Sequence, residues 1–344
     1  MTIVQSSIRK ILLIKFRGIG DVILSTVVLE NLKRNFPNAS IDFLTEKPSD
    51  QLLKLFDEIN EVHLFSEKNL SGRLKLIRKI RKEKYDLIFD FYANPFTAQI
   101  IFLSGAKYKA GFPYRGRKYA YNLFGPEERG KYHAADLHLE FLKKLGLSVT
   151  SNTLKLSLDN DSTKFAEGFF NKTFSQNNFV IGISPSGGWQ SKKCDPIKFA
   201  EIADAASQKY NAKIMIVWGP GDEIETDDII RFMKTEAIKA PPTNIKQMAA
   251  LISHCNILIA NDSGPMHIST AVGTPTLSLH GPTDPNLQGP YGSKHVWINK
   301  SDLHCIICNK LECPYNHECF LELDVNDVIA KVDKLIAVSY THLT

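Results

Sequence analysis

The sequence predicts an α/β protein with two domains, each built on a parallel sheet that helices cover on both faces. Short, almost continuously apolar runs alternate with segments whose apolar residues recur at helical spacing, as expected for strands buried on both faces. This alternation stops in a polar stretch at residues 147–161 and then restarts. The chain length of 344 residues also suits two domains. We therefore expect domains at residues 1–155 and 156–336, with residues 337–344 as a tail that fits no element.

The first half contains four expected strands, at residues 11–16, 40–45, 61–65 and 86–91. The first is the apolar run ILLIKF, and a turn at Arg17-Gly18-Ile19-Gly20 leads from it into a helical pattern that ends before Pro37. Further helical patterns separate the later strands, which is typical of a parallel sheet.

The second half repeats this organisation. Strands are expected at residues 179–184, 213–218, 256–260 and 275–279, and helices near 196–210, 222–234 and 325–336. Two Rossmann-like halves of this kind are expected to face each other across a cleft. Open α/β sheets bind their ligands at the carboxyl ends of the strands, which would line this cleft.

Composition and charge narrow the possible partners. No apolar run approaches the roughly 18 to 20 residues that span a bilayer, and the start of the chain lacks a signal-peptide pattern, so we expect a cytoplasmic protein. Residues 1–150 carry 25 Lys and Arg against 16 Asp and Glu (+9), and residues 151–344 carry 17 against 21 (−4). The basic first half predicts an anionic partner. Because no nucleic-acid motif is present, we favour a membrane surface or an acidic substrate.

A turn rich in glycine follows the first expected strand. Gly18-Ile19-Gly20-Asp21 lacks the third glycine of a dinucleotide fingerprint, and the carboxylate of Asp21 would repel a phosphate. Two roles for Asp21 remain open, and they are compatible. It can accept a proton from a substrate hydroxyl, or it can cap the following helix.

Two loops in the second half suit a diphosphate. In residues 184–193, hydroxyls, glycines and two lysines follow a buried strand, which indicates either a phosphate cradle or a solvated loop. In Asn261-Asp262-Ser263-Gly264, the amides of Ser263 and Gly264 are expected at a helix N-terminus, which favours anions. We expect Asp262 to orient the loop and His267 to be structural. The Gly- and Pro-rich turns at 273–275 and 280–285 follow.

As an ordered set, these motifs resemble glycosyltransferase family 9, the ADP-heptose:lipopolysaccharide heptosyltransferases. The matching segments are GDVILSTVVLENLKRNFP, SPSGGWQSKK, WGPGDE, NDSGPMHISTAVGTP and HGPTDP, within about residues 10–336. The resemblance implies a B-type glycosyltransferase fold with an acceptor-binding first domain and a donor-binding second domain. It also implies an inverting enzyme that requires no metal or other cofactor and moves heptose from ADP-heptose to Kdo or heptose of the lipopolysaccharide inner core.

The family's functional residues carry over by motif. Asp21 matches the family's proposed general base, beside Gly18 and Gly20, and Lys192 matches the lysine that contacts the donor diphosphate. His133 matches a histidine that opens the last helix of the acceptor domain. The donor-binding residues implied are Ser186, Ser191, Trp218, Gly219, Asp222, Glu223, Asp262, Ser263, Gly264, Met266 and His267, with either Asp222 or Glu223 expected near the ribose. The chain departs from the family at Lys193-Cys194, usually Arg-Trp, and at Ser184, frequently His.

Two basic segments of the first half could bind anionic partners. Residues 73–84 place Leu74, Ile77 and Ile80 on one helical face among many cations, and either lie on an anionic leaflet or form a solvated helix. Residues 107–121 interleave five cations with five aromatics and form either a flexible loop or a cradle for the acceptor, with Arg115 and Arg117 on its phosphates. The expected partners are thus an ADP-sugar, an anionic lipid-linked saccharide and the inner-membrane surface, without nucleic acid.

Four of the six cysteines cluster near the C-terminus. Cys305, Cys308, Cys313 and Cys319 form a C-x2-C-x4-C-x5-C pattern. It is compatible with a structural zinc site, although its spacing is tighter than in a common zinc ribbon. Reduced structural thiols are the alternative. We assign these cysteines no catalytic role in either case.

Three functions fit the sequence. The first is a heptosyltransferase, and the second is a nucleotide-sugar binding protein that keeps the Ser263-Gly264 loop but performs no transfer. The third is another sugar-nucleotide enzyme, such as an epimerase, on the same scaffold. Replacement of Asp21 by Ala separates the first two, because only the enzyme requires that carboxylate.

Overall fold

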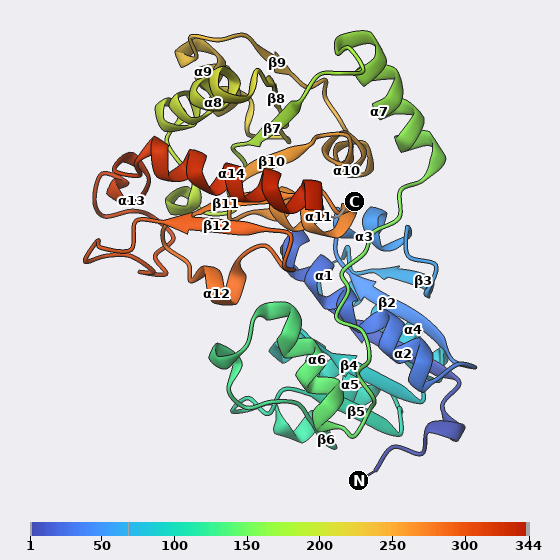
Figure 1. Ribbon diagram of the computed structural model, residues 1–344. Helices are drawn as coiled ribbons and strands as arrows, with labels where there is room; N and C mark the ends of the chain where they lie inside the picture. Colours follow the sequence, from blue (N-terminus) through green and yellow to red (C-terminus); the bar gives the residue numbers. More distant parts are fainter. Residues whose placement is uncertain (1, 68, 342–344) are drawn as a thin grey trace. The chain divides into compact units, whose positions relative to one another are not determined.

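The computed structural model describes residues 2–67 and 69–341, and the chain divides into two compact units, Met1–Leu154 and Lys155–Thr344. Within the described residues, each unit is centred on a six-stranded sheet whose paired strands are all parallel (Figure 1). The α/β class and the parallel sheets predicted from the sequence are confirmed.

The sheet of unit 1 has the strand order β3-β2-β1-β4-β5-β6. Its strands are β1 (Lys10–Ile14), β2 (Ser40–Thr45), β3 (Ile59–Leu64), β4 (Leu87–Asp90), β5 (Tyr108–Gly111) and β6 (Leu123–Phe124). Its helices are α1 (Ile19–Ser25), α2 (Leu29–Asn35), α3 (Ser49–Leu53), α4 (Leu70–Lys82), α5 (Pro95–Leu103) and α6 (Ala134–Lys144), with 3-10 turns η1 (Gln5–Ser7), η2 (Thr26–Val28), η3 (Lys118–Ala120) and η4 (Arg129–Lys131). All residues of β1 after Lys10 are buried, because helices cover both faces of a parallel sheet.

One face of this sheet packs against α4 and α5. Leu12 and Ile88 of the sheet share a buried cluster with Ile80 of α4 and Ile100 of α5. A capping box, in which Asn94 and Thr97 exchange side-chain bonds to backbone, starts α5. Because Ile80 is fully buried and Ile77 packs against the same cluster, the apolar face of α4 covers the core. Leu74, on the same face, is 44% exposed. Of the two alternatives that the sequence left open, a solvated surface helix therefore fits α4 better than a helix that lies on a leaflet.

The sheet of unit 2 has the order β12-β11-β10-β7-β8-β9. Its strands are β7 (Val180–Ser184), β8 (Lys213–Ile216), β9 (Ala237–Lys239), β10 (Ile257–Asn261), β11 (Thr276–His280) and β12 (Val296–Asn299). Its helices are α7 (Asn160–Thr173), α8 (Pro196–Tyr210), α9 (Glu223–Phe232), α10 (Ile245–Ser253), α11 (Gly264–Val272), α12 (Pro285–Gln288), α13 (Glu318–Leu321) and α14 (Val325–Thr341), with η5 (Gln190–Lys192). Phe199 of α8 and Val332 of α14 fill the core on one face.

The last helix is longer than expected. It was predicted to end at residue 336, whereas α14 continues to Thr341, so most of the predicted tail is helical. Residues 342–344 lie outside the described residues. No helix in the described part of the chain is both long enough and apolar enough to traverse a bilayer.

Each sheet reverses its strand order beside its first strand. In unit 1 the chain builds β1, β2 and β3 towards one edge and then β4, β5 and β6 towards the other, and unit 2 repeats this from β7 and β10. The loops that follow β1 and β4, and those that follow β7 and β10, are therefore neighbours at the carboxyl edge of their sheets. Such a reversal is where open α/β sheets bind ligands.

Candidate active site

Lys192 and Asp262 follow the two central strands of unit 2. Lys192 ends η5, after β7, and Asp262 comes directly after β10. The Lys192 Nζ lies 2.7 Å from Asp262 Oδ2 and 4.5 Å from the centroid of the Trp189 ring. Only 15% of the Lys192 side chain and 6% of the Asp262 side chain are exposed. The contacts with Asp262 and Trp189 hold the Lys192 ammonium group at the point where the strand order reverses. There it can stabilise a bound diphosphate.

A buried network holds Asp262 on its other side. The hydroxyl of Thr283 donates a 2.5 Å hydrogen bond to Asp262 Oδ2, and the ring of His280 lies nearby, 2.8 Å from the hydroxyl of Ser278. Burial alone would raise the pKa of Asp262, but the charges of His280 and Lys192 outweigh it, and the pKa is lowered. Burial lowers the pKa of His280 to about 4, against the opposing charge of Asp262. We infer a Lys192–Asp262 ion pair beside a neutral imidazole at neutral pH.

The N-terminus of α11 adds hydrogen-bond donors. Ser263 is its N-cap residue, and Pro265 occupies the first turn of this nine-residue helix. The Ser263 hydroxyl is buried and has no hydrogen-bond partner among the described residues. Free backbone amides, the partial positive charge of the helix end and an unused hydroxyl together suit a phosphate group.

Asn261 fastens the Lys192 loop to the end of β10. Its Oδ1 accepts a 3.1 Å hydrogen bond from the amide of Cys194, and its Nδ2 donates a 2.9 Å bond to the carbonyl of Pro185. The loop between residues 185 and 194 is therefore fixed at both ends. Sequence reasoning did not assign this role to Asn261, although a buried amide at a strand end is the available signal.

The loop after β8 contacts the loop after β7 through Asp222. Asp222 Oδ2 accepts a 2.5 Å hydrogen bond from the Ser186 hydroxyl and a 3.2 Å bond from the amide of Gly219. The exposed Glu223 folds back onto the amide of Gly221 at 2.8 Å. Of the two acidic candidates, Asp222 is therefore the one that joins the Ser186 loop.

The remaining donor-site candidates are mostly enclosed by unit 2. The indole of Trp218 donates a 2.7 Å bond to the carbonyl of Ala240, and the Ser191 hydroxyl donates a 2.5 Å bond to the carbonyl of Lys310. Met266 and His267 are buried in α11. The contacts of Trp218 and Ser191 hold the loops in place.

In unit 1, Asp21 lies in the first turn of α1 without capping it. The N-cap residue is Gly18, with a φ of +62°, so the predicted capping role of Asp21 is wrong. A Cβ on Gly18 would lie 2.9 Å from Asp21 Oδ2, which explains why glycine fits here. Asp21 Oδ1 lies 3.1 Å from Lys15 Nζ, and 53% of the Asp21 side chain is exposed. Its carboxylate can therefore reach a substrate hydroxyl.

Basic and imidazole groups gather near Lys15. His133 is the N-cap residue of α6, and its Nδ1 accepts a 3.2 Å bond from the amide of Ala135. Burial, and then the charges of Lys15, Arg129 and His133, lower the pKa of His138 well below its ordinary value. Lys15, Arg129 and His138 were not among the site residues predicted from the sequence. Lys15 carried a signal, since a lysine inside the apolar run ILLIKF requires a partner.

Arg115 and Arg117 lie in the basic segment of unit 1, where Arg115 borders a hollow. Arg115, Lys118 and Tyr119 line this hollow of about 540 Å³, and the Arg117 guanidinium lies 5.7 Å from the centroid of the Tyr114 ring. No contact in the described part of the chain joins the two arginines to Asp21. Their role towards an acceptor stays a prediction.

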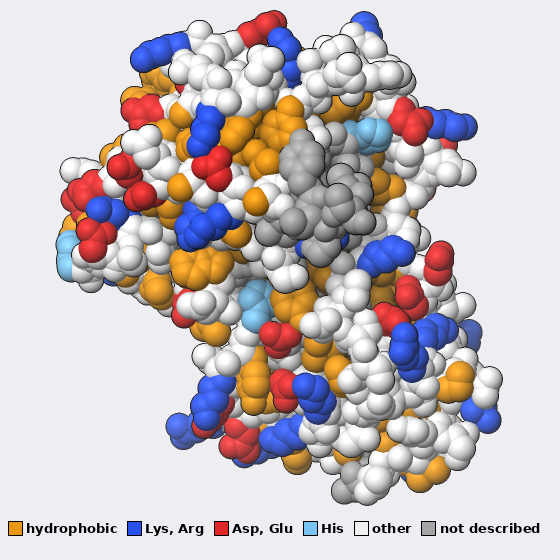
Figure 2. Space-filling view, viewed as in Figure 1, with side chains coloured by type: hydrophobic (Ala, Val, Ile, Leu, Met, Phe, Trp, Pro, Cys, Tyr) orange, Lys and Arg blue, Asp and Glu red, His pale blue; other side chains and the backbone are white. Residues whose placement is uncertain are grey.

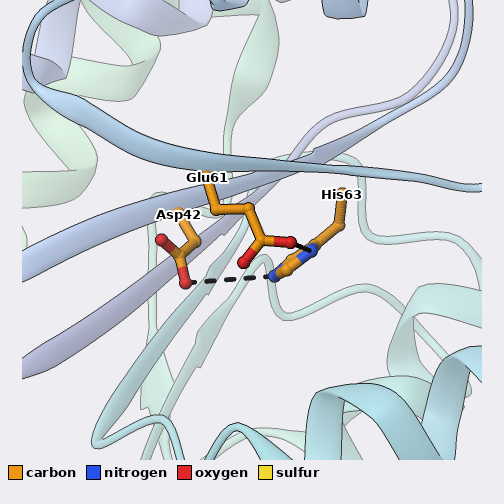
Figure 3. Close-up of side chains that lie close together, drawn as sticks. All are labelled: Asp42, Glu61 and His63. Atoms are coloured by element: carbon orange, nitrogen blue, oxygen red, sulfur yellow. Dashed lines mark ion pairs between the residues drawn. The ribbon is translucent and has the colours of Figure 1, made fainter.

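The four clustered cysteines do not form a preformed metal site. All are free thiols. Among the described residues, the one group of three or more His, Cys, Asp or Glu side chains whose ligand atoms all lie within 4.8 Å of one another is Asp42, Glu61 and His63, on β2 and β3 (Figure 3). The sulfurs of Cys305, Cys308, Cys313 and Cys319 therefore lack the closeness that a tetrahedral zinc site requires.

The Asp42 group is closed by protein contacts instead. The Tyr85 hydroxyl donates to Asp42 Oδ2 at 2.7 Å and lies 2.7 Å from His63 Nε2. Glu61 Oε1 lies 3.0 Å from His63 Nδ1, and Asn60 donates to Asp42 Oδ1 at 2.9 Å. These contacts use the atoms that a metal would need, and we assign the group a structural role in unit 1.

Comparisons with known proteins agree with the fold and the motifs. The sequence profile of "Glycosyltransferase family 9 (heptosyltransferase)" matches residues 73–318. The chain is 27% identical to lipopolysaccharide heptosyltransferase 3 of Escherichia coli K12, over 92% of this chain and 95% of that protein. It is 28% identical to lipooligosaccharide heptosyltransferase 2 of Campylobacter jejuni, over 94% and 97%.

Solved structures share the fold of the whole chain. The family 9 glycosyltransferase of Veillonella parvula superposes with a TM-score of 0.84 at 23% identity, covering 96% of this chain and 97% of that one. The E. coli heptosyltransferase WaaC with ADP superposes with a TM-score of 0.73 at 17% identity, covering 95% and 99%. The predicted B-type glycosyltransferase fold is thereby confirmed, and the chain belongs to glycosyltransferase family 9 (heptosyltransferase).

Proposed function

We propose that this protein transfers heptose from ADP-heptose to the inner core of lipopolysaccharide, on a Kdo or heptose hydroxyl. Full-length similarity to lipopolysaccharide and lipooligosaccharide heptosyltransferases supports the acceptor class. A related fold crystallised with ADP-2-deoxy-2-fluoro heptose supports the donor class. On this proposal, unit 1 binds the acceptor and unit 2 binds the donor, at the cytoplasmic face of the inner membrane.

The observation that carries the proposal is the Lys192–Asp262 pair beside the start of α11. As the sugar leaves ADP, negative charge develops on the β-phosphate. The Lys192 ammonium, the α11 amides and the Ser263 hydroxyl are placed in unit 2 to stabilise that charge. These groups supply positive charge and donors from the protein itself, so the mechanism requires no metal.

The exposed carboxylate of Asp21 supplies the base. The acceptor hydroxyl attacks the anomeric carbon as it gives its proton to Asp21, and ADP leaves from the opposite side. Configuration at the anomeric carbon is thereby inverted. Lys15 holds the Asp21 carboxylate in unit 1, and Gly18, Gly20, His133, Arg115 and Arg117 are proposed to contact the acceptor.

The test is transfer in a purified system. The protein is incubated with ADP-heptose and with lipopolysaccharide core truncated at successive positions, and mass spectrometry detects each added heptose. The proposal expects one truncated core to gain one heptose, in the presence of EDTA as in its absence. Cores from cells lacking the protein, with and without complementation, identify the same position in vivo. Binding of ADP-heptose without any product, or conversion of the free donor, would support one of the other two functions instead.

A further inference from the structure

A patch of exposed apolar side chains in unit 1 has no role in the chemistry described above. Phe102 and Leu103, at the end of α5, are 53% and 39% exposed, and Tyr119 of η3 is 56% exposed. The Phe102 and Tyr119 rings pack edge to face with their centroids 5.5 Å apart. Residues seventeen positions apart thus form one continuous surface, the Phe102 patch (Phe102, Leu103 and Tyr119).

Cations surround this patch closely. Lys109 Nζ lies 5.9 Å from the Phe102 ring centroid and donates a 3.3 Å bond to the Phe102 carbonyl. Arg81, at the end of α4, donates a 3.3 Å bond to the carbonyl of Leu103. Two further lysines are exposed: Lys118 directly precedes Tyr119 in the sequence, and Lys107 lies two residues before Lys109. The alkyl stems of such side chains extend apolar surface, while their charged ends remain at its rim.

These cations have no acidic counterparts. Residues 91–126 contain no Asp or Glu, and no ion pair found in the described part of the chain involves Arg81, Lys107, Lys109 or Lys118. On α4, by contrast, Lys75 and Lys79 pair with Glu67 and Glu61, and Figure 2 shows acidic and basic side chains interspersed over the face it presents. The Phe102 patch is therefore a local concentration of positive charge around exposed apolar groups.

We propose that the Phe102 patch docks unit 1 on an anionic lipid bilayer. Phenylalanine and leucine side chains enter the acyl boundary, the amphipathic tyrosine remains at the level of the headgroups, and lysine and arginine meet lipid phosphates. The cations around the patch would repel a basic partner protein. The inference deepens the proposed function, because a lipid-linked acceptor is itself held in a bilayer. The apolar residues of the patch are not those of residues 73–84, for which the sequence left a leaflet-bound helix and a solvated helix as alternatives.

Vesicle co-sedimentation tests the proposal without any transfer reaction. Vesicles of phosphatidylglycerol and phosphatidylethanolamine are compared with vesicles of phosphatidylcholine alone, at low and at high salt. We expect binding to the anionic vesicles only, weakened by salt. Binding of the wild-type protein to neither kind of vesicle, or equally to both, would overturn the proposal.

Two independent variants address the patch. The double variant Phe102→Ser, Leu103→Ser removes two of the three apolar groups, and Arg81→Gln with Lys107→Gln removes two cations, which should weaken binding about thirtyfold. The matched controls lie in unit 2: Ile224→Ser, at a residue 76% exposed, and Lys172→Gln on α7. Controls are expected to bind as wild type does. Unchanged binding by both patch variants would also overturn the proposal.

Transfer to a water-soluble acceptor fragment separates this inference from the proposed function. Both patch variants are expected to retain that activity, because none of the four residues that they replace lines the hollow beside Arg115 or contacts Asp21 within unit 1. Vesicle binding without any transfer by the wild-type protein would preserve the docking surface and refute the heptosyltransferase function. Heptose transfer by a wild-type protein that does not bind vesicles would support the heptosyltransferase function and refute the docking surface.

Discussion

The Lys15 ammonium lies 3.1 Å from the Asp21 carboxylate, and the two side chains differ sharply in exposure, at 5% and 53%. A buried lysine directly after the central strand β1 thus holds an acid that is open to solvent. On the proposed mechanism, Lys15 positions the base and does not itself touch the substrate.

Replacing Lys15 by Met tests this positioning role. Methionine fills similar space at the end of β1, so the free energy of unfolding should change by only about 1 kcal/mol. The Asp21 carboxylate, however, loses its fixed partner, and we expect kcat to fall about tenfold or more while the KM for ADP-heptose stays the same. Lys15→Arg, which keeps the charge, should recover part of the rate. A wild-type kcat in Lys15→Met would show that the pair has no catalytic consequence.

Lys192→Ala should damage both catalysis and folding. It removes the charge that stabilises departing ADP, for an expected loss of about a hundredfold in kcat. It also leaves buried Asp262 unpaired, at a cost of about 3 kcal/mol in unfolding free energy. Lys193→Ala is the matched control, because Lys193 pairs with Asp222 and Glu225 instead. Equal effects of the two variants on kcat would argue against the role of Lys192.

Ser263→Ala should separate ligand binding from stability. Because the Ser263 hydroxyl has no hydrogen-bond partner among the described residues, its loss should leave the unfolding free energy unchanged or slightly higher. ADP affinity should fall about fivefold, for one lost hydrogen bond to phosphate. Thr283→Val is the contrasting variant: Thr283 donates to Asp262, so stability should fall by about 1–2 kcal/mol. Calorimetric ADP titration and urea unfolding measure both quantities.

Stability should decline in mild acid. The folded-state pKa of buried His280 is about 4, below its ordinary 6.5, and that of buried His138 is lowered in the same direction. The unfolded chain therefore takes up protons first. The stabilisation is complete above about pH 6.5 and is lost as the pH falls towards 4, by about 2 kcal/mol for His280 between pH 6.5 and 5.

Urea unfolding at a series of pH values checks this expectation. His138→Gln should flatten the dependence between pH 6.5 and 5, whereas His304→Gln, at an exposed position, should leave it as in the wild-type protein. A stability that is constant across this interval would contradict the burial of neutral imidazoles.

The strands around each strand-order reversal and the loops after them were predictable, because runs such as ILLIKF and NILIA are almost continuously apolar and are followed by turn residues, Gly18 after the first and Asn261 after the second. The sequence did not predict four short strands, because so few residues carry no periodicity: β5 (YKAG), β6 (LF), β9 (AIK) and β12 (VWIN). The same holds for contacts across the fold. Nothing in the sequence spacing of Asp262 and Thr283 indicates that the Thr283 hydroxyl donates a hydrogen bond to Asp262, because this contact depends on neighbouring loops at one sheet edge.

The most direct test of the account is a single-turnover measurement of heptose transfer by the wild-type protein and by Asp21→Asn, combined with ADP titration of both. The amide cannot accept the acceptor proton, so we predict a fall in the transfer rate of about 10²–10⁴-fold with unchanged ADP affinity. Transfer by Asp21→Asn at the wild-type rate, or no heptose transfer by the wild-type protein on any truncated core, would contradict it.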